Sequence, residues 1–398
     1  MGWAVTVIDL ADLLTGRQRR VRAEMTARGI DALILTDAVN IRYATGTRNM
    51  QVFTSRNSPS RYCFLPADGP VVMFEFTGAI HLSEGLPTVQ EVRPAQTASF
   101  VAVGESIADV ERAWAAEMAA LIRERCGETP TIGIERINAG AAIALAEHGF
   151  SLVDAQEPVE RARAIKLAAE LLCIRESLAA TEAAMAAMQL SIEPGLTENE
   201  LWSVFHQHVI ARGADYIETR LLTSGEHTNP WFQETSSHVI EPNSLIAFDT
   251  DVVGVHGYYS DFSRTFHVGP DAPTARQRTL YRIAHEQVQH NMAIIEPGLT
   301  FAEYSQRAWD LPDEFAGNRY YLSAHGVGMT GEYPYLYHHR DFADLGYDGV
   351  IEPGMTLCVE SYIGAPGEAE GVKLEQQILV TDSGIELLSL YPFEESLL

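Results

Sequence analysis

A six-residue sequence recurs in the second part of the chain and limits the folds it can adopt. IEPGLT occurs at residues 192–197 and 295–300, and the variant IEPGMT occurs at 351–356. Pro-Gly at the centre favours a type II turn, because proline fixes φ at the first central position and glycine permits a positive φ at the second. The offset of 103 residues between the first two copies is too long for a solenoid. The repeat predicts a domain of two related halves, although three such short matches can also arise by chance.

The residues after each copy predict what each turn leads into. Thr197 and Glu200, and then Thr300 and Glu303, have the S/T-x-x-E spacing of a capping box, which begins a helix. The third copy instead runs into TLCVESYIG, which is strand-like. We therefore expect each half to contain a helix, a turn, a second helix and then strands.

The first part of the chain has a different pattern. A length of 398 residues is too great for one typical core and suits two domains. Helical and strand-like segments alternate here: an amphipathic helix at 17–29, strands at DALILTD, YCFLP, VVMFEF and TIGIE, and a long helix at 107–126. Near residue 160 the pattern changes to an Ala/Leu/Glu-rich helical stretch at 167–190. We expect an α/β N-terminal domain over residues 1–160 and a second domain over 161–398.

Composition excludes some partners. A net charge of −26 opposes binding to nucleic acid, because phosphates would be repelled. No apolar run reaches the ~18 residues of a membrane span. Asp9 and Asp12 stand where a signal peptide would be basic and then apolar. The four cysteines are scattered without CxxC spacing, which is typical of reduced thiols. We expect a cytoplasmic protein that binds neither membrane nor nucleic acid.

Three carboxylates interrupt an otherwise apolar β segment, FDTDVVGVHGYYSDFSRTF at 248–266. The side-chain period of a strand places Asp249 and Asp251 on one face, and GVHGYY can reverse the chain and return Asp261 towards them. Crowded carboxylates repel one another and are costly to bury, and a bound cation removes that cost. The alternative is a set of solvated acids on an open sheet face. Because the flanking residues are apolar, we favour a metal site.

Three residues further along the chain extend this set. His325 lies in the Gly-rich sequence SAHGVGM, Glu360 in TLCVESYIG and Glu375 in GVKLEQQILVT. A lone histidine is often a core residue and a lone glutamate in a strand is often an edge residue, so each is weak evidence alone. Together the six residues offer five carboxylates and one imidazole, which suits Mn, Fe, Co or Zn, and carboxylates can bridge two such ions.

This series of motifs resembles the creatinase/aminopeptidase P/methionine aminopeptidase superfamily, whose catalytic domain has the pita-bread fold. The resemblance covers the second domain fully and the first more loosely. It implies a creatinase-like α/β N-terminal domain and an α+β pita-bread catalytic domain of two pseudo-symmetric halves. It also implies a dimeric enzyme in which two divalent ions are held by Asp249, Asp251, Asp261, His325, Glu360 and Glu375.

The chain departs from the peptidases of this superfamily. Asp261 follows Asp249 by twelve residues and Asp251 by ten, and neither is the peptidase spacing. Peptidases also use two further histidines to handle the scissile amide, and here Trp231 or Phe232 and Glu332 stand in their places. The other histidines nearby are out of register, and we interpret them as surface or outer-shell residues: His227, His238, His338 and His339.

The D-T-D…D triple, TNPW and HGVG-x-x-x-EYP resemble the dimethylsulfoniopropionate lyase branch of the superfamily. That branch cleaves a C–S bond by β-elimination to give acrylate and dimethyl sulfide, which implies a small carboxylate substrate. A sulfonium group could rest against aromatic faces. The candidates are Trp231, Tyr320, Tyr321 and Tyr333, with ordinary packing an equal alternative for the last two.

One departure concerns the proton-abstracting base. The lyase branch implies an aspartate six residues after the metal histidine, where this chain has Gly331. Either Glu332 or Tyr320 replaces it, or the substrate differs. Three hypotheses remain: a two-metal lyase acting on a small carboxylate, a hydrolase of C–N bonds such as an Xaa-Pro peptidase, and a metal-free binding protein. We favour the first.

Overall fold

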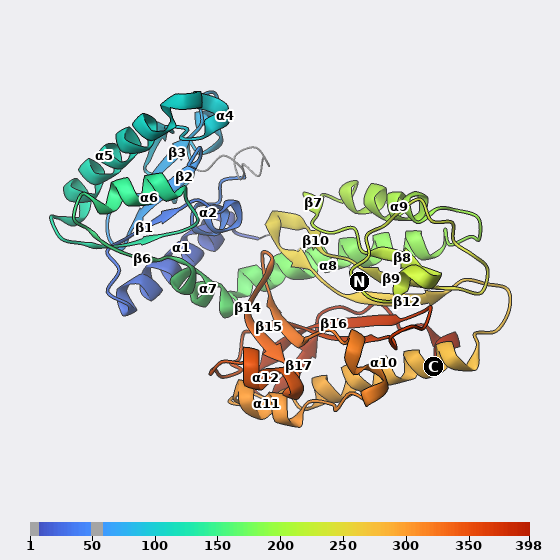
Figure 1. The fold of residues 1–398 in the computed structure, drawn as a ribbon. Helices are drawn as coiled ribbons and strands as arrows, with labels where there is room; N and C mark the ends of the chain where they lie inside the picture. The colour runs from blue at the N-terminus through green and yellow to red at the C-terminus, as the bar shows by residue number, and fades with distance from the viewer. Residues whose placement is uncertain (1–7, 49–58) are drawn as a thin grey trace. The chain divides into compact units, whose positions relative to one another are not determined.

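The computed structural model describes residues 8–48 and 59–398. Internal contacts divide the chain into two compact units, Met1–Arg163 and Ala164–Leu398. Figure 1 shows the ribbon of each unit. None of the helices in the described ranges is both long and apolar enough to cross a membrane.

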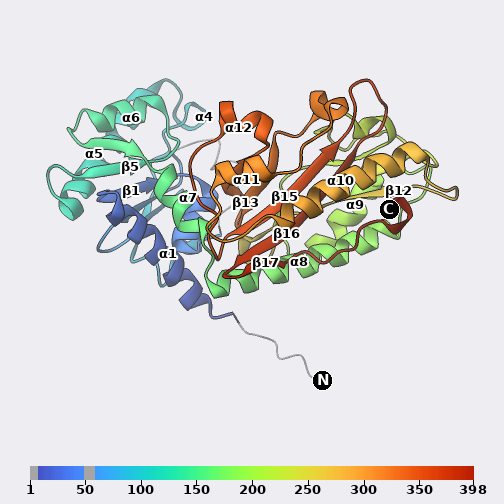
Figure 2. The same cartoon turned by 90° about the horizontal axis from the view of Figure 1, so that it is seen from below.

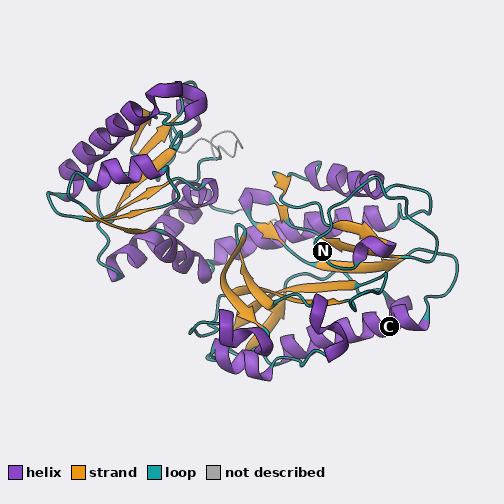
Figure 3. Cartoon of the chain, viewed as in Figure 1, coloured by secondary structure: helices purple, strands orange, loops and turns teal. Residues whose placement is uncertain are grey.

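The N-terminal unit is a six-stranded mixed sheet with helices packed on it (Figure 3). The strand order is β4-β3-β2-β1-β5-β6. Its strands are β1 Ala32–Leu35, β2 Tyr62–Pro66, β3 Val72–Glu75, β4 Glu91–Pro94, β5 Thr131–Ile134 and β6 Ser151–Asp154. Its helices are α1 Leu10–Ala27, α2 Ala38–Thr45, α4 Phe100–Val103, α5 Ile107–Cys126, α6 Ala139–Ala146 and α7 Gln156–Ala164, with short 3-10 turns η1 Ile80–Leu82 and η2 Gly104–Ser106. The predicted α/β class is confirmed.

The elements of this unit follow the predicted pattern closely, with one difference. Helix α1 begins at Leu10 rather than near residue 17, because the side chain of Asp9 accepts hydrogen bonds from the backbone N–H groups of Ala11 and Asp12 and caps the helix. On α5, Trp114 packs against the ring of Tyr62 in the sheet. This contact shows how the long helix covers one face of the sheet.

The C-terminal unit contains two similar successions of helices and strands. The first half comprises α8 Ala168–Gln189, α9 Glu198–Ile210, β7 Tyr216–Ile217, β8 Leu222–Ser224, η3 Gly225–Thr228, β9 Leu245–Asp249, β10 Val252–Val253, η4 Val255–Gly257, β11 Tyr259–Ser260 and β12 Ser263–His267. The second comprises α10 Ala275–Ala293, α11 Phe301–Arg307, η5 Asp313–Asn318, β13 Leu322–Val327, β14 Gly331–Tyr337, α12 His339–Leu345, β15 Thr356–Ile363, β16 Val372–Thr381, β17 Gly384–Leu387 and η6 Glu395–Leu397. Two three-stranded sheets, β11-β10-β7 and β12-β9-β8, and one five-stranded sheet, β14-β13-β15-β16-β17, result.

The sequence repeat marks corresponding points of the two halves. Gly195 and Gly298 have φ of 97° and 92°, as the predicted turns require. The N–H of Gly195 donates to the carbonyl of Ile240, and the N–H of Gly298 donates to that of Ile351. Both copies continue into a helix with the predicted capping box, while the third copy leads into β15. The expectation of two related halves is therefore confirmed in the hydrogen bonding of the turns.

Helices flank the strands of this unit on both sides (Figure 2). Helix α10 packs against β15 and β16, and α8 packs against β11 on the other side. The core under α10 contains Leu280, Val288, Leu357 and Ile378. The strands between the helices are buried along their length, so polar side chains on them face a protein interior.

Candidate metal centre

The three predicted aspartates lie at the ends of short strands. Strand β9 ends at Asp249, which pairs with Ser263 of β12. The strand does not continue to Asp251 as predicted, because Asp251 has a φ of 41° and begins the link to β10. Asp261 lies between β11 and β12. All three are buried, and one carboxylate oxygen from each lies within 4.8 Å of the others.

The other three predicted ligands come from the five-stranded sheet. Glu360 on β15 and Glu375 on β16 are direct partners in the antiparallel register, and so project from the same face. His325 lies on the neighbouring strand β13, opposite Cys358 of β15. Nδ1 of His325 donates to the carbonyl of Gly326 at 2.9 Å, which turns Nε2 towards the carboxylates.

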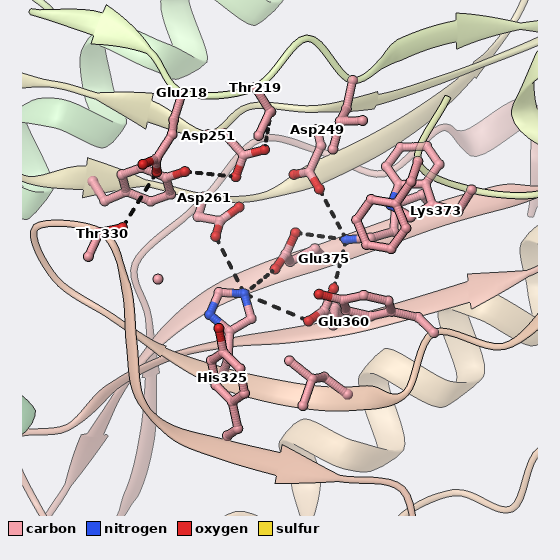
Figure 4. Close-up of a pocket in the computed structure, with 18 residues that line it drawn as sticks. Glu218, Thr219, Asp249, Asp251, Asp261, His325, Thr330, Glu360, Lys373 and Glu375 are labelled. Carbon is pink, nitrogen blue, oxygen red and sulfur yellow. Dashed lines mark hydrogen bonds and ion pairs between the residues drawn. The ribbon is translucent and has the colours of Figure 1, made fainter. Parts of the chain in front are cut away.

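The two sets meet in one cavity (Figure 4). His325 Nε2 lies 3.5 Å from an oxygen of Asp261, 3.7 Å from one of Glu360 and 3.4 Å from one of Glu375. Asp249 and Asp251 lie across the cavity from His325. The cavity has a volume of about 270 Å³, and all six predicted ligands line it. The structure thus brings together every residue that the sequence predicted for the metal centre.

Lys373 is a member of this site that sequence reasoning missed. Its side chain is buried, and Nζ lies 3.3 Å from Asp249, 3.0 Å from Glu360 and 3.0 Å from Glu375. The signal was present in GVKLEQ, because Lys373 precedes Glu375 by two residues and a strand places such residues on one face. One ammonium group therefore offsets part of the carboxylate charge.

The charges at the site shift several pKa values. Burial raises the pKa of Asp261 and of Asp249, and neighbouring carboxylates add to this increase. Burial alone would lower the pKa of His325, but Glu375 and Glu360 outweigh it and raise that pKa to about 9. Burial also opposes ionisation of Glu375, yet Lys373 and His325 lower its pKa below the ordinary value. Five buried carboxylates thus exceed the positive charge that the chain itself supplies.

The donor set fits divalent metal ions. Oδ1 of Asp261 and Oε1 of Glu360 are buried and accept no hydrogen bond from the described residues, so oxygen donors remain available within the cavity. Oxygen ligands with one imidazole suit Mn, Fe, Co or Zn. The residues that would hold the ions are the six predicted ones.

We expect metal affinity to rise with pH. Burial, reinforced by the charge of Asp249, raises the pKa of Asp251 to about 8, and burial raises that of Glu360 to about 7. Because a ligand must lose its proton to bind metal, affinity should increase up to about tenfold per pH unit for each proton displaced, below these pKa values. Metal titrations between about pH 6 and pH 8 test this, and an affinity independent of pH would contradict it.

The metal-free protein should show the opposite trend in stability. Its folded form binds these protons more tightly than the unfolded form, in which the same carboxyl groups have pKa values of about 4. The free energy of unfolding should therefore fall as the pH rises from about 4 to about 8, and bound metal should reduce this fall. Thermal unfolding of the metal-free and metal-loaded protein across that range measures the difference.

Aromatic side chains form another wall of the cavity. Trp231 and Tyr320 line it, as predicted from the sequence, together with Phe232, Tyr259 and Tyr335. Nζ of Lys373 lies 5.8 Å from the ring centroids of both Trp231 and Tyr320. The cavity therefore presents a charged face and an aromatic face to any bound molecule.

A carboxylate at the rim of the cavity was also missed by sequence reasoning. Glu218 follows β7, and its backbone N–H donates to the carbonyl of Asp251 at 2.9 Å. The hydroxyl of Thr330, in the turn between β13 and β14, lies 3.5 Å from the Glu218 carboxylate (Figure 4). Glu218 is exposed and lies in a loop between short strands, so its sequence context gives no sign of a site.

Two predicted site residues lie elsewhere. Glu332 does not line the cavity, and its carboxylate instead accepts from Nζ of buried Lys166 at 2.5 Å. Tyr333 does not line it either, because its ring packs against Phe301 and Tyr347. The prediction that Glu332 turns inward is wrong, since Gly331 begins strand β14 without a positive φ and successive strand residues face opposite sides. Gly331 itself lines the cavity.

Comparisons with known proteins match both units. The model of metallopeptidase family M24 matches residues 172–382, and that of the creatinase/prolidase N-terminal domain matches residues 17–165. Two dimethylsulfoniopropionate lyases named DddP, from Roseovarius nubinhibens and Roseobacter denitrificans, are each 36% identical over 100% of this chain and 90% of their own. A solved Xaa-Pro dipeptidase from Bacillus anthracis superposes with a TM-score of 0.75 at 23% identity, covering 96% of this chain and 99% of that one.

Proposed function

Since the chain belongs to metallopeptidase family M24 in the creatinase/aminopeptidase P superfamily, we propose that it is a dinuclear-metal lyase that cleaves a small carboxylate by β-elimination. It has the pita-bread fold of that superfamily and is a metal-dependent enzyme that resembles the DddP lyases. The proposal concerns the reaction, the number of ions and the substrate. The metallopeptidase family also contains hydrolases, so the choice between these reactions depends on the site.

The observation that supports the lyase is what surrounds the metal ligands. A buried charged cluster faces aromatic side chains across a cavity of about 270 Å³, which is large enough for a small zwitterion. Trp231 is 8% exposed and lines the cavity, so its ring face can contact a sulfonium or other cationic group. The charged face would attract a carboxylate once divalent ions offset its five carboxylate charges. A zwitterion such as dimethylsulfoniopropionate has both groups.

The metal ions and Tyr320 would have separate roles in the elimination. Divalent ions at this site would attract the substrate carboxylate and acidify its α-proton. We propose that the phenolate form of Tyr320, which lines the cavity, accepts this proton as the C–S bond breaks and dimethyl sulfide leaves. Burial and the charge of Glu360 raise the pKa of Tyr320, while Lys373 opposes the rise. Tyr320 should therefore act as a base only when additional positive charge occupies the cavity.

Metal analysis followed by a substrate assay tests the proposal. Elemental analysis of the purified protein is expected to find at least two divalent ions per chain, of Fe, Mn, Zn or Co. The metal-loaded protein is then assayed for dimethyl sulfide and acrylate from dimethylsulfoniopropionate. Release of neither product would overturn the dimethylsulfoniopropionate assignment. A metal-free protein that turns over substrate would overturn the metal role.

Peptidase activity is expected to be absent or very weak. The positions of the two amide-handling histidines are occupied by the Trp231–Phe232 segment and by Glu332, which is paired with Lys166. Losing one positioned donor of this kind typically costs about 10²–10³ in rate. Assays of the metal-loaded enzyme with Xaa-Pro dipeptides measure this. Efficient turnover would instead support the hydrolase alternative.

A further inference from the structure

A second cluster of metal-binding side chains lies in the first half of the C-terminal unit. One donor atom from each of Glu198, His227 and His238 lies within 4.8 Å of the others. Ligands that bind one zinc ion at about 2.0–2.2 Å each lie at most ~4.4 Å apart, so the two partly exposed imidazoles would move closer together to share an ion. The two imidazole rings have centroids 4.2 Å apart, and Nδ1 of His227 lies 3.5 Å from Oε1 of Glu198. None of the three lines the cavity described above.

The carboxylate of this cluster is rigidly held. Glu198 is completely buried in the first turn of α9. Its Oε1 accepts from the backbone N and the hydroxyl of Ser224, at 2.7 and 3.1 Å, and its Oε2 accepts from those of Ser236, at 3.0 and 2.9 Å. The backbone N–H of Glu198 donates to the carbonyl of His238 at 3.0 Å. Glu198 therefore fixes the positions of both segments that carry the histidines, and a serine hydroxyl must turn away from its carboxylate for an ion to bind there.

The surroundings favour a cation. His238 lines a separate cavity of about 400 Å³, whose walls also include Glu226, Glu241 and Glu370. Their carboxylates create a negative field that attracts a divalent ion. The space beside His238 leaves room for water molecules in the remaining coordination positions. Both histidines are partly exposed, so an ion can reach them from solvent.

We propose that Glu198, His227 and His238 form a second site for a divalent ion of the zinc type, separate from the catalytic cavity. Two imidazoles and one carboxylate are an established zinc ligand set. The two histidines bracket the loop that carries Trp231 and Phe232 into the catalytic cavity. An ion bound by both histidines closes this loop and holds its aromatic side chains at the cavity wall. Binding of this ion does not depend on which reaction the enzyme catalyses.

The test is a zinc count on the full-length protein. Wild type and the variants His227→Gln and His238→Gln are dialysed to equilibrium against buffered free Zn²⁺, and zinc per chain is measured. Each variant is expected to bind this ion at least about tenfold more weakly, and so to retain one ion fewer at intermediate Zn²⁺ concentrations. His208→Gln is the matched control, because His208 lies on α9 but contacts Arg212 rather than Glu198.

Hydrogen exchange supplies a second readout that does not depend on activity. In wild type, Zn²⁺ is expected to slow amide exchange in residues 226–240, by up to about 100-fold at a free concentration 100 times the Kd. The effect should be absent in both histidine variants and present in His208→Gln. Unchanged zinc counts in both variants would overturn the proposal. A loss in His208→Gln equal to theirs would also overturn it, because surface histidines in general would then be the cause.

Discussion

Replacing His325 by alanine is expected to empty the metal centre and abolish turnover. Nε2 of His325 is the nitrogen donor of the set and lies within 3.7 Å of carboxylate oxygens from Asp261, Glu360 and Glu375. Loss of a partner outside the coordination sphere already costs about 10–100-fold in metal affinity, so loss of a ligand should cost more. The measurements are bound metal per chain and the rate of the reaction found in the substrate assay.

The control for this prediction is His339→Ala. The side chain of His339 is 50% exposed on α12 and lies 3.7 Å from the carboxylate of Asp310. Neither residue lines the cavity. That variant should retain both metal and activity. A His325→Ala protein that is folded, carries the wild-type metal content and keeps the wild-type rate would show that His325 is not a ligand.

Replacing Tyr320 by phenylalanine is expected to lower lyase turnover by about 10²–10⁴-fold, the usual contribution of a positioned acid or base. The phenylalanine ring keeps the aromatic wall, so KM should change far less than kcat. Tyr321→Phe is the matched control, because Tyr321 is 41% exposed and does not line the cavity. Equal rates for the Tyr320→Phe variant and wild type would remove Tyr320 as the base.

Gly331→Asp offers a complementary gain-of-function measurement. A Cβ at position 331 would have His325 Nδ1 as its nearest neighbour, at 3.9 Å, and the backbone there needs no positive φ. A side chain therefore fits at this place in the cavity wall. If the chain is a lyase whose base lies elsewhere, restoring the aspartate of the lyase branch should raise dimethyl sulfide release. No increase in an enzyme that already releases dimethyl sulfide would indicate that a base at position 331 does not act in this chain.

The fold was largely predictable because its signals are local. Helix α5 begins and ends where amphipathic periodicity predicted, and the capping boxes at Thr197 and Thr300 begin α9 and α11. The gathering of the proposed metal ligands was predictable because a carboxylate in a buried strand is costly unless something compensates it. Glu360 and Glu375 both stand in such strands.

The remaining site residues were harder to predict because they depend on which face or loop meets the cavity. Lys373 precedes Glu375 by two residues, but only the fold shows that its ammonium lies among three carboxylates. Glu332 was assigned to the cavity because it is adjacent to Gly331, yet adjacency in a strand places two residues on opposite faces. Its partner, Lys166, is 166 residues away in sequence.

The six proposed ligands are divided equally between the two halves of the C-terminal unit, and this has a consequence for folding. Asp249, Asp251 and Asp261 come from the first half, and His325, Glu360 and Glu375 come from the second. Neither half alone offers more than three of the six donors. Ions shared between them would act as a reversible cross-link across more than a hundred residues of chain. The docked arrangement would then gain stability by mass action as free metal rises, so metal supply would set the fraction of molecules in which the two halves are assembled.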